Sequence, residues 1–159
     1  MAATANNDAE RVWQLIQTIS ICMLTTHDGE KIRSRPMGSY ARPEDDAIYF
    51  LSDARRHKDE EIRANPNVCL AFADGHKFVS VTGRAVVSRD KAKIKELWGT
   101  PAKAWWDSPD DPNIRLLTVS PDDAEFWEGP GKVVATIKMM AAAATKSRPD
   151  LGESRKVAM

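Results

Sequence analysis

Two arginines stand two residues apart in the segment KIRSRPMGSY, which spans 31–40. The alternating pattern of this segment predicts a β-strand, on which side chains two residues apart share one face, roughly 6.8 Å from each other. A guanidinium group binds phosphate through a planar fork of donors. Arg33 and Arg35 could therefore converge on one anionic group of a ligand. The alternative is that both arginines belong to a solvated face of the strand.

Four potentially cationic side chains, at positions 55–58, follow the apolar segment AIYFLSD. We predict a helix over ARRHKDEEIRAN (54–65), with Ser52 or Asp53 as its N-cap. Cations are unfavourable at the positive end of the helix dipole unless an anion binds there. Backbone N–H groups at the helix start and these side chains would together form a phosphate site. Alternatively, the two arginines pair with the acidic residues four positions later in the same helix.

Other patterns of catalytic residues are absent from the sequence. His27, His57 and His76 lack the spacing of a metal-binding helix, and no CxxC, GxSxG or GxxxxGK[ST] motif occurs. The sequence therefore predicts no metal site and gives no support to a serine hydrolase or a nucleoside triphosphatase. Cys22 and Cys69 lie in apolar segments, which favours buried thiols over a disulfide, a redox pair or a nucleophile.

Four tryptophans fall in the last two-fifths of the chain, in or near predicted loops and short elements: Trp98, Trp105, Trp106 and Trp127. An indole ring in such a position can stack on a flat conjugated ligand or anchor a protein interface. The alternative is that some of these rings fill the core at the ends of the sheet.

The composition is typical of a globular domain. The 159 residues carry 23 basic and 23 acidic side chains, so the formal net charge is zero and no nucleic-acid partner is expected. The N-terminus lacks the pattern of a secretory signal, and no apolar run approaches the ~20 residues of a membrane-spanning helix. We expect a cytoplasmic protein with no membrane partner.

The patterns along the chain predict six or seven strands joined mostly by turns, with helices between them. Asp28-Gly29 is a hairpin turn signal, and Gly83 predicts a bulge in a long strand. This arrangement favours an antiparallel barrel with peripheral helices in one domain. The predicted strands are 19–26, 31–40, 47–52, 68–74, 78–88, 113–120 and 123–129. The predicted helices are 9–18, 54–65, one beginning at Ser88 or Asp90, and 133–145, followed by an extended or loosely ordered tail.

Five stretches in this order resemble the FMN-binding split-barrel superfamily that contains pyridoxamine 5′-phosphate oxidase, and within it the general stress protein 26-like branch. The resemblance covers roughly 9–131, and LGESRKV near the end of the chain is also similar to that branch. The stretches are SRPM (34–37), IYFLSDARRHKDEEIRANPNV (48–68), VSVTGRAVV (79–87), KELWGTPAKAWW (95–106) and DAEFWEG (123–129).

The resemblance implies a mainly β fold with peripheral helices, a six-stranded antiparallel split β-barrel. It further implies a homodimer with FMN at the subunit interface, a single domain over 1–159 with a family-like core over 9–131, and a C-terminal helix and tail over 132–159. Arg35, His57 and Lys58 would hold the phosphate, and Trp105 and Trp106 would lie where the partner subunit adds contacts. The full set of implied cofactor-binding residues is Arg33, Ser34, Arg35, Pro36, Met37, Leu51, Ser52, His57, Lys58, Phe78, Trp105, Trp106 and Trp127.

The sequence also departs from the oxidase. The Arg-Leu-His segment that follows EFW in the oxidase is replaced by EGPGK, and Tyr40 stands where a lysine is expected. We therefore expect a flavin-binding general stress protein and not a pyridoxamine phosphate oxidase. It would be either an FMN-dependent oxidoreductase with a nicotinamide or small-molecule redox partner, or a non-catalytic flavin-binding or buffering protein. A third possibility is an interaction module or a haem protein, for which no convincing histidine ligand is present. No catalytic residue is predicted.

Overall fold

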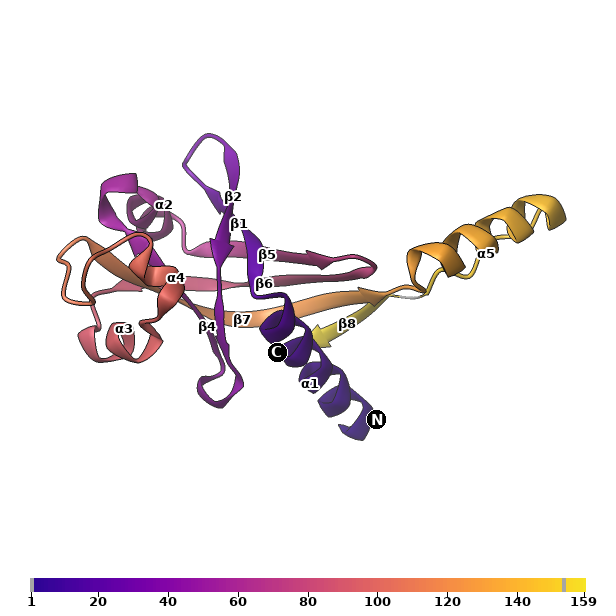
Figure 1. The fold of residues 1–159 in the computed structure, drawn as a ribbon, viewed down its shortest axis with the longest axis horizontal. Coiled ribbons are helices and arrows are strands. Elements are labelled where there is room, and N and C mark those ends of the chain that lie inside the picture. The colour runs from indigo at the N-terminus through magenta and orange to yellow at the C-terminus, as the bar shows by residue number, and fades with distance from the viewer. Residues whose placement is uncertain (1, 153) are drawn as a thin grey trace.

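One antiparallel sheet of eight strands organises the chain, and the computed structural model describes residues 2–152 and 154–159 of it (Figure 1). The elements in chain order are α1 (Ala2–Ile19), β1 (Ile21–His27), β2 (Ile32–Gly38), β3 (Tyr40–Arg42), the 3₁₀ turn η1 (Pro43–Asp45), β4 (Ala47–Asp53), the 3₁₀ turn η2 (Ala54–Arg56), α2 (Lys58–Ala64), β5 (Asn67–Asp74), β6 (Lys77–Ser88), α3 (Lys91–Leu97), α4 (Thr100–Lys103), β7 (Ile114–Glu128), α5 (Lys132–Thr145) and β8 (Ser154–Ala158).

The strands run in the order β2-β1-β5-β6-β7-β4-β3, with β8 paired to β7. The first part of β7 pairs with β4 and its last part with β8, while β6 pairs along almost its whole length. A register shift between Thr82 and Gly83 marks the predicted bulge in β6. A bulge increases local twist and bends a sheet. The sheet is curled into a half-barrel with peripheral helices, which confirms the predicted mainly β, split-barrel fold.

Two short strands, β3 and β8, extend the sheet beyond the strands predicted from the sequence. The predicted strands 113–120 and 123–129 form one continuous strand, β7, that runs through Pro121. Of the two alternatives predicted for the tail, extended or loosely ordered, its last residues take the extended one: β8 pairs with β7 and buries Val157. The predicted helix over 133–145 is confirmed as α5.

The main core lies between α1 and the inner face of the sheet. Apolar residues at helical spacing, among them Val12, Leu15 and Ile16, put one face of α1 against Leu24 and Phe72 of the sheet, and all five are buried. Because this core continues across β1, β4, β5, β6, β7 and β8, the helix and the sheet form one unit.

A second, smaller core covers the opposite face of β4. Tyr49 and Leu51 point away from α1 and pack with Ile94 of α3, Ala102 of α4 and Trp106. Strand β4 is thus buried on both faces, which explains why AIYFLS is an uninterrupted apolar run and not an alternating one. The end of β4 is held between two packed layers, and this is where the candidate site lies.

None of the helices in the described residues is both long enough and apolar enough to cross a bilayer. Cys22 is buried and Cys69 is partly buried, and both are free thiols. Burial raises the pKa of Cys22 to about 12. A thiol that stays protonated is a poor nucleophile, so the structure gives Cys22 a packing role.

Candidate functional site

A cavity of about 420 Å³ opens between β2, the end of β4, η2 and α4. Both cationic and aromatic side chains line it. It is lined by Arg35, Pro36, Met37, Gly38, Tyr40, Leu51, Ser52, Asp53, Arg56, Lys58, Pro101, Ala102, Trp105 and Trp106. Eight of the thirteen predicted site residues are among them, although they come from three separate parts of the chain.

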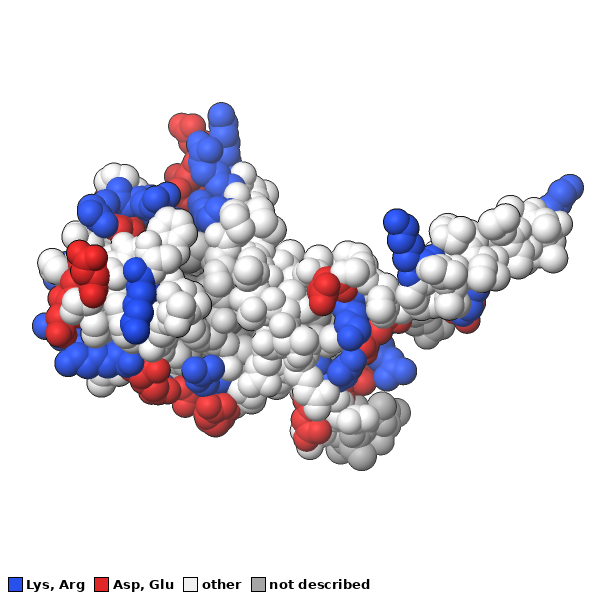
Figure 2. Space-filling model, viewed as in Figure 1, with Lys and Arg blue, Asp and Glu red and all other residues white. Residues whose placement is uncertain are grey.

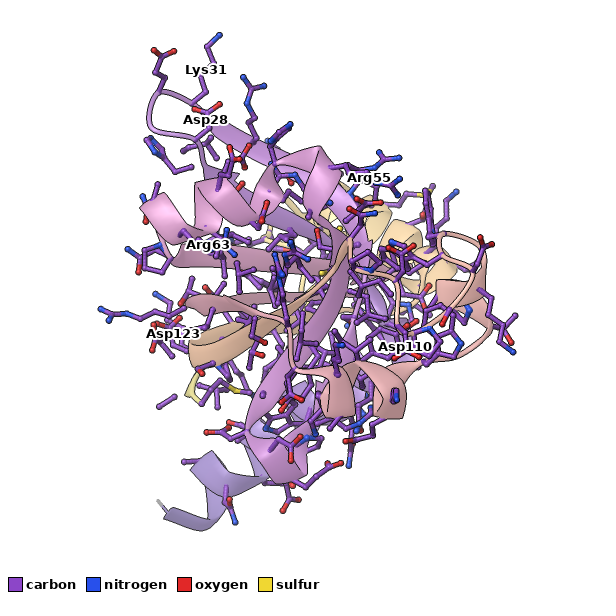
Figure 3. All side chains as sticks on the ribbon, turned by 90° about the vertical axis from the view of Figure 1, so that its left-hand side faces the viewer. Asp28, Lys31, Arg55, Arg63, Asp110 and Asp123 are labelled. Carbon is purple, nitrogen blue, oxygen red and sulfur yellow. The ribbon has the colours of Figure 1, made fainter. Side chains whose placement is uncertain are left out.

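The two arginines of β2 have different ion-pair partners and lie in different places. Arg33 binds back to Asp28 in the hairpin turn, with 2.5 Å between Nε and Oδ2. Backbone N–H donation from Lys31, and then the Arg33 side chain, hold the pKa of Asp28 below its usual value. Asp28 and Lys31 mark the tip of this hairpin, which projects from the molecule (Figure 3). Arg33 therefore closes the turn and does not line the cavity.

Arg35 points into the cavity and is anchored there. Its Nη1 donates to Thr26 Oγ1 at 2.5 Å, and its Nη2 donates to Glu61 Oε2 at 2.9 Å. Glu61 also accepts a hydrogen bond from Thr26 Oγ1 at 2.7 Å. This network joins β1, β2 and α2 and fixes the guanidinium group in place. Of the cations that line the cavity, Arg35 is the one with a carboxylate partner in the part of the chain that the structure describes.

The predicted helix over 54–65 is wrong in its first turn. Asp53 caps the 3₁₀ turn η2 by accepting from the N–H of Arg55 at 2.9 Å, and His57 then adopts a left-handed conformation (φ 59°) before α2 begins. A left-handed residue ends one helical segment and redirects the chain. The four cations are therefore spread around a kink and do not share one helical turn.

This kink separates the four cations. Arg55 folds back onto Asp53, with Nε and Oδ1 2.9 Å apart, and lies at the surface (Figure 3). His57 is exposed and faces Glu60, with 3.3 Å between Nδ1 and Oε1. Arg56 and Lys58 line the cavity instead. The structure thus places Arg56, which was not among the predicted residues, where His57 was expected.

Lys58 lines the cavity without a carboxylate at ion-pair distance among the described residues. Its Nζ lies 3.3 Å from Met37 Sδ, a weak acceptor, and no ion pair to it occurs among the described residues. Burial lowers the pKa of Lys58, and the positive charges of Arg35 and Arg56 lower it further. The carboxylates of Glu61 and Asp53 only partly offset this lowering of the pKa. A half-buried ammonium group beside two guanidinium groups is unfavourable in the absence of an anion. This cluster is therefore a candidate anion site.

Replacing Lys58 with methionine should stabilise the ligand-free protein, by about 1 kcal/mol at neutral pH. Because the pKa of Lys58 is lower in the folded than in the unfolded state, the charged side chain costs folding free energy below the folded-state pKa. This cost disappears as the pH rises through the folded-state pKa towards the unfolded value of 10.5. Urea unfolding of both proteins at pH 7 and near pH 10.5 checks this: the advantage of the variant should shrink with rising pH. A variant less stable at neutral pH would contradict it.

Two buried polar atoms of the cavity have no well-aligned hydrogen-bond partner among the described residues. Ser52 is 3% exposed, and its Oγ makes no hydrogen bond to any described residue. The indole Nε1 of Trp106 is likewise buried without a well-aligned acceptor. The pKa of Asp53 is lowered to about 2 mainly by the Arg55 side chain. The Trp106 indole N–H lies near the same carboxylate and lowers this pKa only weakly. Buried polar atoms are nearly always satisfied in folded proteins. A ligand with polar atoms would satisfy them here.

The aromatic residues predicted for the site lie in two places. Trp105 stands at the mouth of the cavity, 67% exposed, with the guanidinium carbon of Arg56 5.7 Å from its ring centre. Trp106 belongs to the smaller core. Phe78 and Trp127 face each other across β6 and β7, in the part of the sheet from which α5 departs, and do not line this cavity. Of the remaining predicted residues, Ser34 is exposed on β2 and its Oγ accepts from Thr25 Oγ1.

A second cavity, of about 560 Å³, lies between α1 and the β7–β8 region. Arg11 forms an ion pair with Glu128, and Arg155 forms one with Asp8. Its charges are mutually compensated, in contrast to Lys58 and Arg56. We therefore assign it a role in holding α1 to the sheet and place the candidate ligand site in the first cavity.

The antiparallel sheet, curled into a half-barrel with peripheral helices, defines a split barrel, and comparisons agree with this class. Residues 7–150 match the family described as "pyridoxamine 5′-phosphate oxidase like". The chain belongs to this family. It is 29% identical to general stress protein 26 of Bacillus subtilis (strain 168) over 99 residues, which are 58% of this chain and 69% of that protein.

Solved structures share the fold. A protein of Jannaschia sp. CCS1 described as a general stress protein 26 matches 98% of this chain and 99% of its own, with a TM-score of 0.75 and 23% identity. General stress protein 26 of Bacillus anthracis str. Sterne matches 74% of this chain and 91% of its own (TM-score 0.67, 26% identity). The "general stress FMN/FAD binding protein" of Xanthomonas citri matches 75% and 87% (TM-score 0.66, 24% identity).

Proposed function

We propose that the cavity binds FMN and that the protein is a flavin-binding general stress protein. The observation that carries this proposal is the uncompensated positive charge of Lys58 and Arg56 beside Arg35. A phosphate group would receive charge-assisted hydrogen bonds from all three side chains. The name of the Xanthomonas citri protein, with its similar fold, supports a flavin as the bearer of that phosphate.

The other walls of the cavity suit the rest of this ligand. Pro36, Met37 and Leu51 offer apolar surface for a flat ring, and Ser52 offers a buried hydroxyl for one of its polar atoms. Trp105 could cover the ring at the mouth of the cavity. A flavin, when bound, would supply hydride or single-electron chemistry. This chain's own residues would bind, orient and shield it.

We further propose a homodimer in which Phe78 and Trp127 complete the site of the second copy. These two rings are 45% and 36% exposed and form one cross-strand patch. They lie too far along the sheet to close the cavity of their own chain, whereas a partner could bring them to it. The exposed Ile21 and Met23 of β1 add apolar surface that a partner would cover.

Oxidation of pyridoxamine phosphate is not part of the proposal. The segment after Trp127 contains Gly129 and Gly131 and leads into α5, and it provides no cationic group to hold a second phosphate before Lys132. Either electron transfer to or from a nicotinamide or another small molecule, or flavin binding without turnover, is consistent with this site. The two free cysteines fit a reducing compartment, and we propose the cytoplasm.

The absorption spectrum of the purified protein, before and after addition of FMN, tests the proposal. We expect flavin bands, or saturable binding of added FMN, and a mass of two chains by light scattering. FAD and riboflavin, titrated in parallel, show how much of the affinity depends on the phosphate. NADH and NADPH oxidation by the loaded protein then separates an oxidoreductase from a flavin-binding protein. Failure of all three flavins to bind would overturn the proposal.

A further inference from the structure

Helix α5 stands away from the rest of the molecule with an apolar stripe in solvent. Val133, Ile137 and Met140 lie at positions i, i+4 and i+7 and are 73%, 61% and 68% exposed. Figure 2 shows this arm as mostly white, with blue side chains near its base and at its outer end. Its only buried residue is Ala142, on the side towards the returning chain. The stripe therefore has no partner among the described residues of its own chain.

Such a helix needs a surface to cover its stripe. A helix of 14 residues is marginally stable alone in water, and most helical stability in proteins comes from packing an apolar face. The chain that follows α5 returns to the sheet, where β8 pairs with β7. An ion pair of 3.5 Å between Lys138 and Asp150 holds this returning segment to the helix. It cannot reach the cavity of its own chain, because α4 and η2 lie at the opposite end of the molecule (Figure 1).

The rim of the cavity offers a surface of matching chemistry. Trp105 is an exposed ring at its mouth, and the loop after it, DSPDDP, carries Asp107, Asp110 and Asp111. Asp110 lies on this loop at the surface and makes a long ion pair of 3.6 Å with Lys95 (Figure 3). The arm carries the opposite charge: Lys132, Lys138 and the following Lys146, with no acidic residue within α5.

We propose that α5 packs on a second copy of this chain, across the mouth of its cavity, with the apolar stripe on Trp105 and the lysines beside the acidic loop. An anionic membrane surface would attract the same lysines, so the choice of a second copy rests on the position of the arm shortly after Trp127, whose ring the proposed dimer brings to the cavity. The arm begins five residues after Trp127, so a partner that brings Trp127 to the cavity also brings α5 to its rim. The inference rests on the proposed function in this one respect.

The structure of the Jannaschia sp. CCS1 protein aligns with this chain over almost its whole length. It matches 98% of this chain, whereas the Bacillus anthracis and Xanthomonas citri structures match 74% and 75%. A match over 98% of the chain leaves only a few residues unaligned, so the alignment with the Jannaschia sp. CCS1 structure includes α5.

Site-specific photo-crosslinking tests the contact in the full-length protein. A photoreactive residue is placed at Met140, and light- and heavy-isotope subunits are mixed so that crosslinks between subunits are recognised by mass. We expect hybrid crosslinks to residues 100–111. A photoreactive residue at Met139, which lies off the stripe, is the matched control and should give few of them. Crosslinks confined to one subunit, or to another surface, would overturn the inference.

A paired variant adds a functional readout. Ile137→Glu combined with Met140→Glu should speed FMN release about tenfold, whereas Met139→Glu should change it less than twofold. If FMN binds to a dimer, but Met140 gives no hybrid crosslinks to residues 100–111 and the double glutamate variant releases FMN at the natural rate, this inference fails and the proposed function stands. If no flavin binds and the protein is a monomer, the proposed function fails first. Cosedimentation with vesicles containing anionic phospholipid, without the hybrid crosslinks, would replace the second copy by a membrane and overturn the inference.

Discussion

Replacing Lys58 with methionine is expected to weaken FMN binding by about 10- to 100-fold and to leave riboflavin binding within about twofold. The ammonium group is partly buried, carries no ion pair in the described structure and stands beside Arg35 and Arg56. A phosphate would relieve this repulsion and accept a charge-assisted hydrogen bond, which contributes roughly 1.5–3 kcal/mol. Riboflavin lacks the phosphate and gains neither effect. Quenching of flavin fluorescence in parallel titrations measures both affinities.

The chain offers matched controls on either side of Lys58. Arg56→Met should also weaken FMN far more than riboflavin, because Arg56 lines the cavity and has no carboxylate partner in the described residues. His57→Ala should change neither affinity by more than about twofold, since the ring is exposed and faces Glu60. A loss on His57→Ala equal to that on Lys58→Met would contradict the assignment of Arg56 to the phosphate. Equal losses for both flavins would contradict a phosphate at this cluster.

The same Lys58→Met change links affinity to stability. The ligand-free variant is expected to be more stable than the natural protein while it binds FMN less tightly. This opposite movement is typical of functional sites, where charges are held together at a cost to the fold. A variant with lower stability and lower FMN affinity would mean that Lys58 packs in the cavity wall and does not bind an anion.

Much of the fold could be predicted from local patterns. The Asp28-Gly29 turn fixes the β1–β2 hairpin, whose register pairs Leu24 with Arg35. The helical spacing of Val12, Leu15 and Ile16 is the spacing of the buried face of α1. These features depend on residues near one another in the chain, so periodicity and turn chemistry are sufficient to predict them.

The candidate site was predicted less completely, because its geometry depends on one dihedral angle and on distant contacts. The left-handed φ of His57 bends the chain so that two of the four neighbouring cations, Arg56 and Lys58, line the cavity. A histidine does not by itself predict a left-handed backbone conformation. The anchoring of Arg35 depends on Glu61, 26 residues away, and the fate of Arg33 depends on Asp28. Spacing along a strand indicates a shared face but not the partner that each side chain will find.

Strand β8 shows a further limit. The residues of SRKVA carry three polar side chains in five, which favours an exposed tail when the sequence is considered alone. The segment becomes a strand because β7 extends beyond its pairing with β4 and leaves an edge to be paired at Asp123 to Trp127. An unpaired edge of this kind is unfavourable for a sheet protein. The length of β7 therefore decides the structure of a segment that lies 27 to 35 positions later in the chain.

Gly83→Ala is expected to lower the free energy of unfolding by about 3 kcal/mol. A β-carbon at this position would lie 2.4 Å from the carbonyl oxygen of Ser120 and 3.1 Å from the Cα of Pro121. Both contacts are to backbone, so rotation of a side chain cannot relieve them. The register shift between Thr82 and Gly83 lies at the same point, where β7 passes from its pairing with β4 to its pairing with β8. Relief of the clash would have to open the bend of the sheet.

Urea unfolding followed by tryptophan fluorescence measures this loss, and Gly131→Ala provides the control. Gly131 has a φ of −53°, and a β-carbon added there meets no atom within 4 Å. Its replacement should change stability by about 0.5 kcal/mol or less, because only the capping preference at the start of α5 is affected. Similar small losses at both positions would show that β6 and β7 can separate at the bulge without loss of pairing. A large loss at Gly83 alone would identify the close approach of the two strands as a requirement for the curvature that holds β4 and the cavity in place.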